Sequence, residues 1–219
     1  MEQTATDEAV PRASQGGEYQ ESGDAVREEG SRSFLREPLV WVDCEMTGLD
    51  VEKDQIIEIA VILTDGTCDT VIEGPTYIIH ADDSVLDSMS EWCRETHGRS
   101  GLTEASRSST ISLQKAEEEI LAFVKKHVSD LKVTPLAGNS VHVDRRFLLK
   151  QMPKLATNLS YRIVDVSSIK ELWHRWRPNS PAFQRVSYEH RALGDIRQSI
   201  NELRYYKKHF FVLPEPAAE

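Results

Sequence analysis

Cysteine is scarce in this sequence, and the cysteines are not spaced as metal ligands or as a redox pair would be. The 219 residues contain three, Cys44, Cys68 and Cys93, an odd number with no paired spacing. This usage argues against a disulfide framework and against a zinc site made of cysteines, and it is typical of a reducing compartment. Long hydrophobic runs are missing as well, since no segment approaches the ~20 consecutive apolar residues of a membrane span. Disulfide-stabilised and membrane-spanning proteins are therefore not expected.

A block of basic residues is also missing. The net charge is −10, of which residues 1–37 contribute −5 and residues 38–219 contribute the other −5. Proteins that grip long nucleic acids gain affinity by neutralising many phosphates with lysine and arginine. We therefore expect any contact with nucleic acid to be short and local, and we do not expect binding of long duplexes.

The two ends of the chain differ in composition from the middle. Residues 1–37 are rich in Glu, Gly, Ser and Gln and poor in large apolar residues, which predicts a disordered acidic tail. A segment that binds a partner is the alternative. The tail lacks the apolar stretch of a signal peptide and is too acidic for a typical transit peptide, so a cytoplasmic location is expected, with mitochondria as the alternative. Residues 212–219 predict a second, short flexible tail, which leaves one domain at 38–211.

Strand and helix patterns alternate across that domain. Compact apolar or β-branched runs predict five strands, at residues 39–44, 56–64, 71–79, 133–137 and 161–166. The third contains Gly74-Pro75 and is expected at a sheet edge. Helices are predicted at residues 84–95, 113–128, 143–152, 168–176 and 192–209, with a loop at 96–110. The order indicates a single α/β domain with a mixed five-stranded sheet flanked by helices.

The first candidate site is Asp43-Cys44-Glu45, at the end of the first predicted strand. Side chains alternate across a strand, so Val42 and Cys44 can face the core while Asp43 and Glu45 project together. Two adjacent carboxylates repel, and a divalent cation removes that cost. Oxygen ligands alone are suited to magnesium or manganese. The alternative is a solvated strand end.

Three further residues complete the candidate site. Asp144 follows the fourth predicted strand, although an acid there can simply stabilise a helix dipole. His190 and Asp195 are five residues apart, which in one helix places them ~140° apart around the axis. They converge only if His190 precedes the helix and Asp195 lies in its first turns. A structural histidine is the alternative for His190.

Taken together, these residues suit phosphodiester hydrolysis with two metal ions. Strand ends of an α/β sheet are where ligands bind. Two divalent ions ~3.5–4 Å apart can activate water and stabilise both the attacking and the leaving oxygen. A histidine is a natural proton acceptor for the attacking water, because its pKa lies near neutral pH.

Longer motifs resemble a known family. The run Trp41–Leu49 is similar to the first motif of the DEDDh 3′-to-5′ exonuclease group in the RNase H-like superfamily. Gly138-Asn139-Ser140 with Asp144, followed by His190 to Asp195, resembles the second and third motifs. Within the group the chain most resembles oligoribonuclease, over roughly residues 38–211. The supporting segments are Met89 to Trp92, Thr96 to Leu102 and Tyr161 to Ser168.

This resemblance implies a reaction. The chain is expected to remove nucleotides from the 3′ end of RNA of two to five nucleotides, with dinucleotides preferred, and to release nucleoside 5′-monophosphates. Two Mg²⁺ or Mn²⁺ ions are the implied cofactors. Four carboxylates are the implied metal ligands and His190 the implied general base; the carboxylates are Asp43, Glu45, Asp144 and Asp195.

The resemblance also implies how RNA binds. Leu49 would wedge against the terminal bases and Trp92 would stack or pack beside them. Tyr161 would reach the active site of the neighbouring subunit in a homodimer. Four residues would cap the 5′ phosphate of a dinucleotide, and a guanidinium among hydroxyls suits that task; they are Ser140, Arg162, Ser167 and Ser168.

The chain departs from the family pattern at two positions, and two alternatives stay open. Gly194 stands where many relatives carry an acid beside Asp195, which predicts a looser start of that helix. Val143 is apolar where relatives are often polar. One alternative is a DEDDh exonuclease that acts on DNA or on longer RNA 3′ ends. The other is a catalytically inactive relative that serves as a binding protein.

Overall fold

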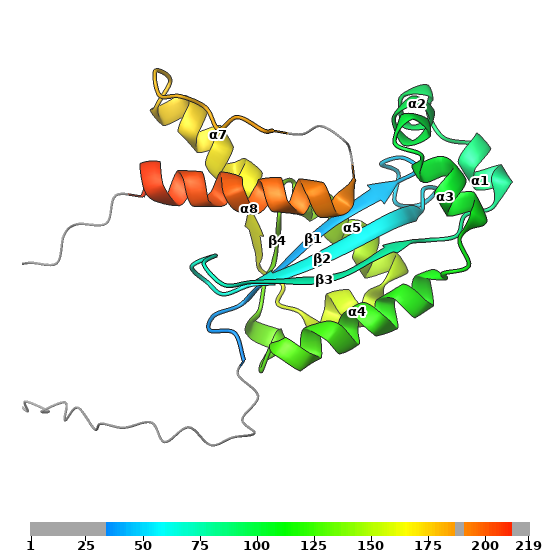
Figure 1. Ribbon diagram of the computed structural model, residues 1–219, viewed down its shortest axis with the longest axis horizontal. Helices are drawn as coiled ribbons and strands as arrows, with labels where there is room; N and C mark the ends of the chain where they lie inside the picture. Colours follow the sequence, from blue (N-terminus) through cyan, green and yellow to red (C-terminus); the bar gives the residue numbers. More distant parts are fainter. Residues whose placement is uncertain (1–33, 187–190, 212–219) are drawn as a thin grey trace, which may run out of the picture. The chain divides into compact units, whose positions relative to one another are not determined.

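The computed structural model describes residues 34–186 and 191–211 (Figure 1). Residues 1–33 and 212–219 lie outside this range, so the two predicted tails stay predictions. His190 also lies outside the described residues. None of the helices in the described part combines the length and apolar character of a membrane span.

A mixed five-stranded sheet forms the centre of the domain, with the strand order β3-β2-β1-β4-β5. β1 pairs antiparallel with β2 and parallel with β4, and β4 pairs parallel with β5. The sequence predicted this mixed sheet and the edge position of β3. The strands are β1 (Leu39–Met46), β2 (Ile56–Thr64), β3 (Val71–Ile78), β4 (Leu136–Gly138) and β5 (Ile163–Asp165).

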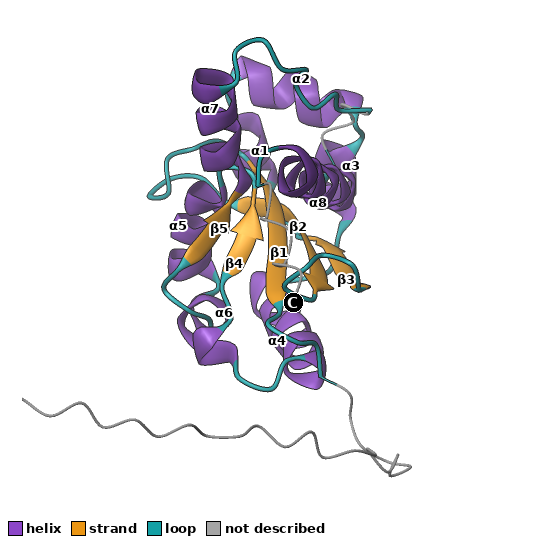
Figure 2. Ribbon diagram, turned by 90° about the vertical axis from the view of Figure 1, so that its left-hand side faces the viewer, coloured by secondary structure: helices purple, strands orange, loops and turns teal. Residues whose placement is uncertain are grey.

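The alternation of side chains along β1 divides the core into two layers. Val40, Val42 and Cys44 belong to a cluster on one face, and Trp41 belongs to the cluster on the other face. Helices α4 (Leu113–His127), α5 (Val141–Gln151) and α6 (Pro153–Asn158) cover the first face. Helices α7 (Val166–Trp176) and α8 (Ala192–His209) cover the second (Figure 2). Both faces of β1 are therefore buried, and its polar residues can sit only near its end.

Three short helices at one end of the sheet correct the sequence prediction. They are α1 (Asp83–Asp87), α2 (Glu91–Arg99) and α3 (Leu102–Ser108), where one helix and a loop at 96–110 were expected. The Ser90 side chain caps α2 by accepting from the Cys93 amide, and Gly101, with φ 74°, separates α2 from α3. The prediction was wrong because Leu102 is buried in a third small core. Tertiary burial overrides the Ser/Gly-rich composition here.

Several predicted boundaries also move. The fourth strand starts at Leu136, and a short 3₁₀ turn, η1 (Leu131–Val133), takes the place of its predicted beginning. Helix α6 was not predicted; Pro153 stands in its first turn, where a missing amide proton costs nothing. Helix α7 begins at Val166 with Asp165 as its N-cap, not at a capping box formed by Ser168. The bounds of α8 agree with the prediction.

Candidate active site

Three carboxylates from distant parts of the chain meet at one end of the sheet. Asp43 and Glu45 project from the last half of β1, and Asp195 lies in the first turn of α8. One ligand atom of each lies within 4.8 Å of the other two. We call these three residues the carboxylate cluster. Helix α8 starts at Ala192, after position 190, which is the arrangement that the sequence required for convergence.

Asp144 stands beside this cluster and is held by the backbone of β1. It lies in the first turn of α5 and is only 6% exposed. Its Oδ1 accepts a hydrogen bond of 2.9 Å from the Cys44 amide, which belongs to the residue between Asp43 and Glu45. The three parallel strands β1, β4 and β5 end at the same edge, so an acid that follows β4 arrives next to the acids of β1.

Burial raises the pKa of three of the four carboxylates, and the fourth, Asp195, accepts a hydrogen bond from Arg185. Burial, and then the charges of Asp144, Glu45 and Asp195, raise the pKa of Asp43 well above its usual value. Burial and the Asp195 charge raise the pKa of Glu45 to about 8. Burial raises the pKa of Asp144 to about 7, against the hydrogen bond from Cys44. Grouped oxygen donors that repel one another suit a hard divalent cation such as Mg²⁺ or Mn²⁺.

A buried ion pair fixes the start of α8 next to the cluster. Glu58 on β2 is 1% exposed and accepts three hydrogen bonds of 2.7–3.1 Å from the Arg191 guanidinium. The Ala192 amide donates a fourth bond of 3.2 Å to Glu58. Arg191 occupies the N-cap position of α8, so the Glu58 carboxylate anchors the helix that carries Asp195.

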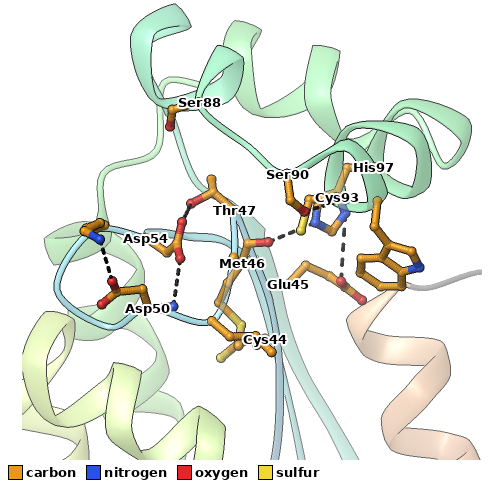
Figure 3. A pocket seen from close by; sticks show the side chains of 14 residues that line it. Cys44, Glu45, Met46, Thr47, Asp50, Asp54, Ser88, Ser90, Cys93 and His97 are labelled. Atoms are coloured by element: carbon orange, nitrogen blue, oxygen red, sulfur yellow. Dashed lines mark hydrogen bonds and ion pairs between the residues drawn. The ribbon is translucent and has the colours of Figure 1, made fainter.

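A cavity of about 810 Å³ opens beside Glu45. The exposed Leu49 and Trp92, at 72% and 62%, line it together with the loop that joins β1 to β2. Figure 3 shows Glu45 and His97, which also line it, pointing toward each other. His97 closes the side next to the cluster: its Nε2 lies 2.9 Å from the Met46 carbonyl oxygen, and its Nδ1 lies 3.9 Å from Glu45 Oε2. An apolar group could therefore enter this cavity beside Leu49 and Trp92 and come close to Glu45.

The loop that carries Leu49 is shaped by one aspartate. Asp54 accepts from the Thr47 hydroxyl at 3.0 Å and from the Asp50 amide at 2.8 Å, on either side of Leu49. The backbone at Gly48 passes so close that a Cβ there would lie 2.4 Å from Asp54 Oδ2. Leu49 is thus exposed at the tip of a loop that is internally tied.

A second polar group surrounds Asp165, the last residue of β5. Its carboxylate accepts from the Ser140 amide at 2.9 Å, from the Ser167 amide and hydroxyl at 3.0 and 2.6 Å, and pairs with His142 Nδ1 at 3.1 Å. Although burial opposes the shift, hydrogen bonds led by the one from Ser167 hold the pKa of Asp165 below its usual value. Ser168 and His142 line a small hollow with Asp165.

The predicted substrate-binding residues fall into separate groups. The structure brings Ser140, Ser167 and Ser168 together around Asp165. Tyr161 and Arg162 lie just before β5 and are both exposed, with the Arg162 guanidinium 4.7 Å from the centre of the Tyr161 ring. Leu49 and Trp92 share the other cavity.

Sequence reasoning missed several residues that shape these sites. Glu58 could have been found, because a lone acid inside the apolar run Ile56–Thr64 demands a buried partner. Asp165 carried a weaker signal, an acid placed at the end of a short apolar run. Asp54 and Arg185 carried none, because both lie in polar loops whose course only the fold decides.

Comparison with known proteins identifies the family. The exonuclease family model of the RNase T type matches residues 40–203. The probable oligoribonuclease of Dictyostelium discoideum is 54% identical over 173 residues, which cover 79% of this chain and 90% of that protein. The mitochondrial oligoribonuclease of Homo sapiens is 50% identical over 191 residues, which cover 85% of this chain and 80% of that protein. The chain belongs to the oligoribonuclease family.

Solved structures agree with this placement at the level of the fold. The moderately thermophilic exonuclease I of Methylocaldum szegediense superposes with a TM-score of 0.60 at 18% identity. The match covers 79% of this chain and 41% of that one, so the chain spans about two fifths of the longer exonuclease. The RNase H-like fold expected from the resemblance is confirmed. An oligoribonuclease-family chain is a nuclease, a hydrolase of phosphodiester bonds.

Proposed function

We propose that this chain is a 3′-to-5′ exoribonuclease that degrades RNA of two to five nucleotides, dinucleotides preferentially, to nucleoside 5′-monophosphates. Its membership of the oligoribonuclease family makes it a hydrolytic exoribonuclease. The observation that carries the proposed mechanism is the meeting of Asp43, Glu45 and Asp195 within 4.8 Å, with Asp144 held beside them. This arrangement argues against the alternative of a catalytically inactive binding protein.

In the proposed mechanism the four acids hold two Mg²⁺ or Mn²⁺ ions. The chemistry that such ions supply is activation of water and stabilisation of charge on the phosphate. Asp43, Glu45 and Asp195 would hold the ions through carboxylate oxygens. Asp144 would use Oδ2, since its Oδ1 is occupied by the Cys44 amide. His190, which lies outside the described residues, would accept the proton of the attacking water as general base.

The same proposal assigns the rest of the substrate. Leu49 would wedge against the terminal bases and Trp92 would pack beside them, because both line the cavity that opens at Glu45. Ser140, Ser167 and Ser168, with Arg162, would cap the 5′ phosphate. The position of the three serines beside the N-termini of α5 and α7 supports this assignment, and a phosphate there would compete with the Asp165 carboxylate for the Ser140 amide and for Ser167. A cap at a fixed distance from the cluster would limit the substrate length.

The proposed binding of a dinucleotide also involves a second subunit, so we propose a homodimer. Tyr161 is 72% exposed, next to the edge strand β5, and would complete the site of the partner subunit. Tyr161→Ala should then slow cleavage of dinucleotides while the cluster still cleaves. Mixing Tyr161→Ala with Asp43→Ala subunits tests the sharing directly. Activity above that of either variant alone is expected, and its absence contradicts a shared site.

A length series tests the function itself. The protein is incubated with labelled RNA of two, five and twenty nucleotides and with matched DNA, with Mn²⁺ or with chelator. Rapid cleavage of the dinucleotide that requires the metal is expected, and Asp43→Ala should abolish it. Preference for the twenty-mer or for DNA would favour the alternative, a DEDDh exonuclease that acts on DNA or longer RNA ends.

For the compartment we propose the cytoplasm, because residues 1–37 are too acidic for a typical transit peptide. Relatives in Mus musculus and Homo sapiens are named as mitochondrial. Import of the full chain into isolated mitochondria, followed by protease protection, would decide the question. A protected, shortened product contradicts the cytoplasmic proposal.

A further inference from the structure

Arg185 contacts the carboxylate cluster from a loop outside the strands and helices. It lies between α7 and α8, and its side chain is 25% exposed. Its Nη1 donates a hydrogen bond of 3.1 Å to Asp195 Oδ1, and its Nη2 lies 3.9 Å from Glu202 Oε2. The guanidinium therefore contacts one member of the cluster, Asp195, directly.

The second arginine near the cluster is bound differently. Arg191 places three hydrogen bonds on Glu58, a carboxylate that is buried and outside the cluster. That pair is bidentate, and the Arg191 charge also opposes, from a distance, the rise that burial causes in the pKa of Glu45. Arg185 instead shares a single hydrogen bond with a cluster carboxylate. A guanidinium has five donor hydrogens, so this geometry leaves it capacity for another anion.

Glu202 holds Arg185 beside the carboxylate cluster even when the bond between Arg185 and Asp195 is broken. Glu202 is 2% exposed and is fixed by the Asn139 amide at 3.0 Å and by the Tyr206 hydroxyl at 3.0 Å. An anchored carboxylate 3.9 Å from one end of the guanidinium attracts it without enclosing it. Arg185 can thus release Asp195 and still remain beside the cluster.

We infer that Arg185 is a phosphate-binding residue of the active site, and that its bond to Asp195 competes with the divalent cation. This inference rests on the proposed function. A cation at Asp195 and the guanidinium repel each other, and both bind the same carboxylate. When a cation binds Asp195, the Arg185 guanidinium can bind a phosphate of the RNA. Its paired N–H donors match the spacing of the phosphate oxygens. There it stabilises the charge that builds up during cleavage.

The test compares Arg185→Gln with the unmodified protein and with a matched control. Arg197→Gln serves as the control, because Arg197 forms a two-bond pair with Glu73 on the surface of the same domain, with both bonds at 2.8 Å. Mn²⁺ affinity is measured by electron paramagnetic resonance, and kcat and KM are measured on a dinucleotide. For Arg185→Gln we expect Mn²⁺ to bind several-fold more tightly and kcat/KM to fall about 100-fold, as when one donor to a transition state is lost.

Arg185→Lys adds a conservative variant. A lysine keeps the charge without the fork, so it should restore the Mn²⁺ affinity of the unmodified protein but only part of kcat/KM. The control should match the unmodified protein in both measurements, and thermal denaturation should show that all variants are folded.

Three outcomes overturn the inference. They are unchanged Mn²⁺ affinity in Arg185→Gln, weaker Mn²⁺ binding with lower activity, and tighter Mn²⁺ binding with unchanged kcat/KM. The second would mean that Arg185 only supports Asp195. Failure of the proposed function looks different, because the unmodified protein itself would then fail to cleave the dinucleotide, whatever its affinity for Mn²⁺.

Discussion

Glu45 on β1 lies directly across from Glu58 on β2, and the two carboxylates have opposite electrostatic situations. Glu58 is compensated by the Arg191 guanidinium and by the Ala192 amide. The pKa of Glu45 is raised to about 8 by burial and by the charges of Asp195 and Glu58. Glu58 therefore has a structural role and its charge is paired, whereas the ionised form of Glu45 would be stabilised by a bound cation.

Replacing Glu58 should weaken both the fold and the site. Glu58→Gln loses charge-assisted hydrogen bonds to Arg191, which costs about 2 kcal/mol of unfolding free energy. Because Glu58 anchors the start of α8, kcat should fall more than KM changes. Glu73→Gln, which breaks the exposed pair with Arg197, should cost at most ~1 kcal/mol and leave kcat unchanged. Urea denaturation and kinetics check both, and equal effects of the two substitutions would contradict the anchoring role.

The metal-free protein should lose stability as pH rises. In the folded state Glu45 keeps its proton up to about pH 8 and Asp144 up to about pH 7, whereas the unfolded groups release theirs near their usual values of 4.5 and 3.8. The folded state thus binds more protons between those limits, so stability falls as pH rises through the window. Melting in chelator at pH 5.5 and 8 measures the effect.

Adding Mn²⁺ and testing Glu45→Gln show whether the carboxylate cluster causes this pH dependence. Mn²⁺ binds ionised carboxylates, so the rise in melting temperature that it causes should be larger at pH 8 than at pH 5.5. Glu45→Gln removes one titrating group and should flatten the pH dependence of the chelated protein. A Glu45→Gln profile parallel to that of the unmodified protein would show that other groups cause the loss.

Gly48→Ala should disturb the loop that presents Leu49. The new Cβ would lie 2.4 Å from Asp54 Oδ2, and that carboxylate is tied to Thr47 and Asp50. Either Asp54 swings away and loses these hydrogen bonds or the loop itself moves, and both cost about 1–3 kcal/mol. Because Leu49 moves with it, we expect KM for the dinucleotide to rise on the order of 10-fold to 100-fold.

Gly98→Ala is the matched control for that substitution. A Cβ at Gly98, in helix α2, meets no atom within 4 Å. Alanine favours a helix over glycine by up to ~1 kcal/mol, so the melting temperature should stay or rise while KM is unchanged. A normal KM in Gly48→Ala would remove the reason to regard the loop as a positioning device.

Gly194→Ala should stabilise the enzyme without harming it. Gly194 lies inside the first turn of α8, next to Asp195, and a Cβ there has open space. Removing backbone freedom from the unfolded chain should add about 0.4–1 kcal/mol. Thermal melting and Mn²⁺ titration check this outcome. A lower melting temperature would contradict this expectation and would mean that the folded protein needs a glycine at position 194.

Most of the elements followed from local patterns. The run Ile56–Thr64 was predicted to the residue, and so was α8, because long apolar or periodic segments dominate their own structure. The region 96–110 was predicted wrongly because its polar composition hides Leu102, which is fully buried. Helix α7 moved by two residues because Asp165 took the capping position. Short elements are decided by contacts that lie far away in the sequence.

The candidate site also has features that the sequence predicts and features that only the fold decides. The identity of the acids, their order and the requirement that a helix begin after residue 190 could be read from the chain, because side-chain alternation and helical geometry are local properties. Sequence alone could not show that Oδ1 of Asp144 is occupied by the Cys44 amide, 100 residues away. Nor could it show which arginine meets Glu58 and which meets Asp195. Such pairings depend on how distant segments pack, and only the tertiary structure brings those segments together.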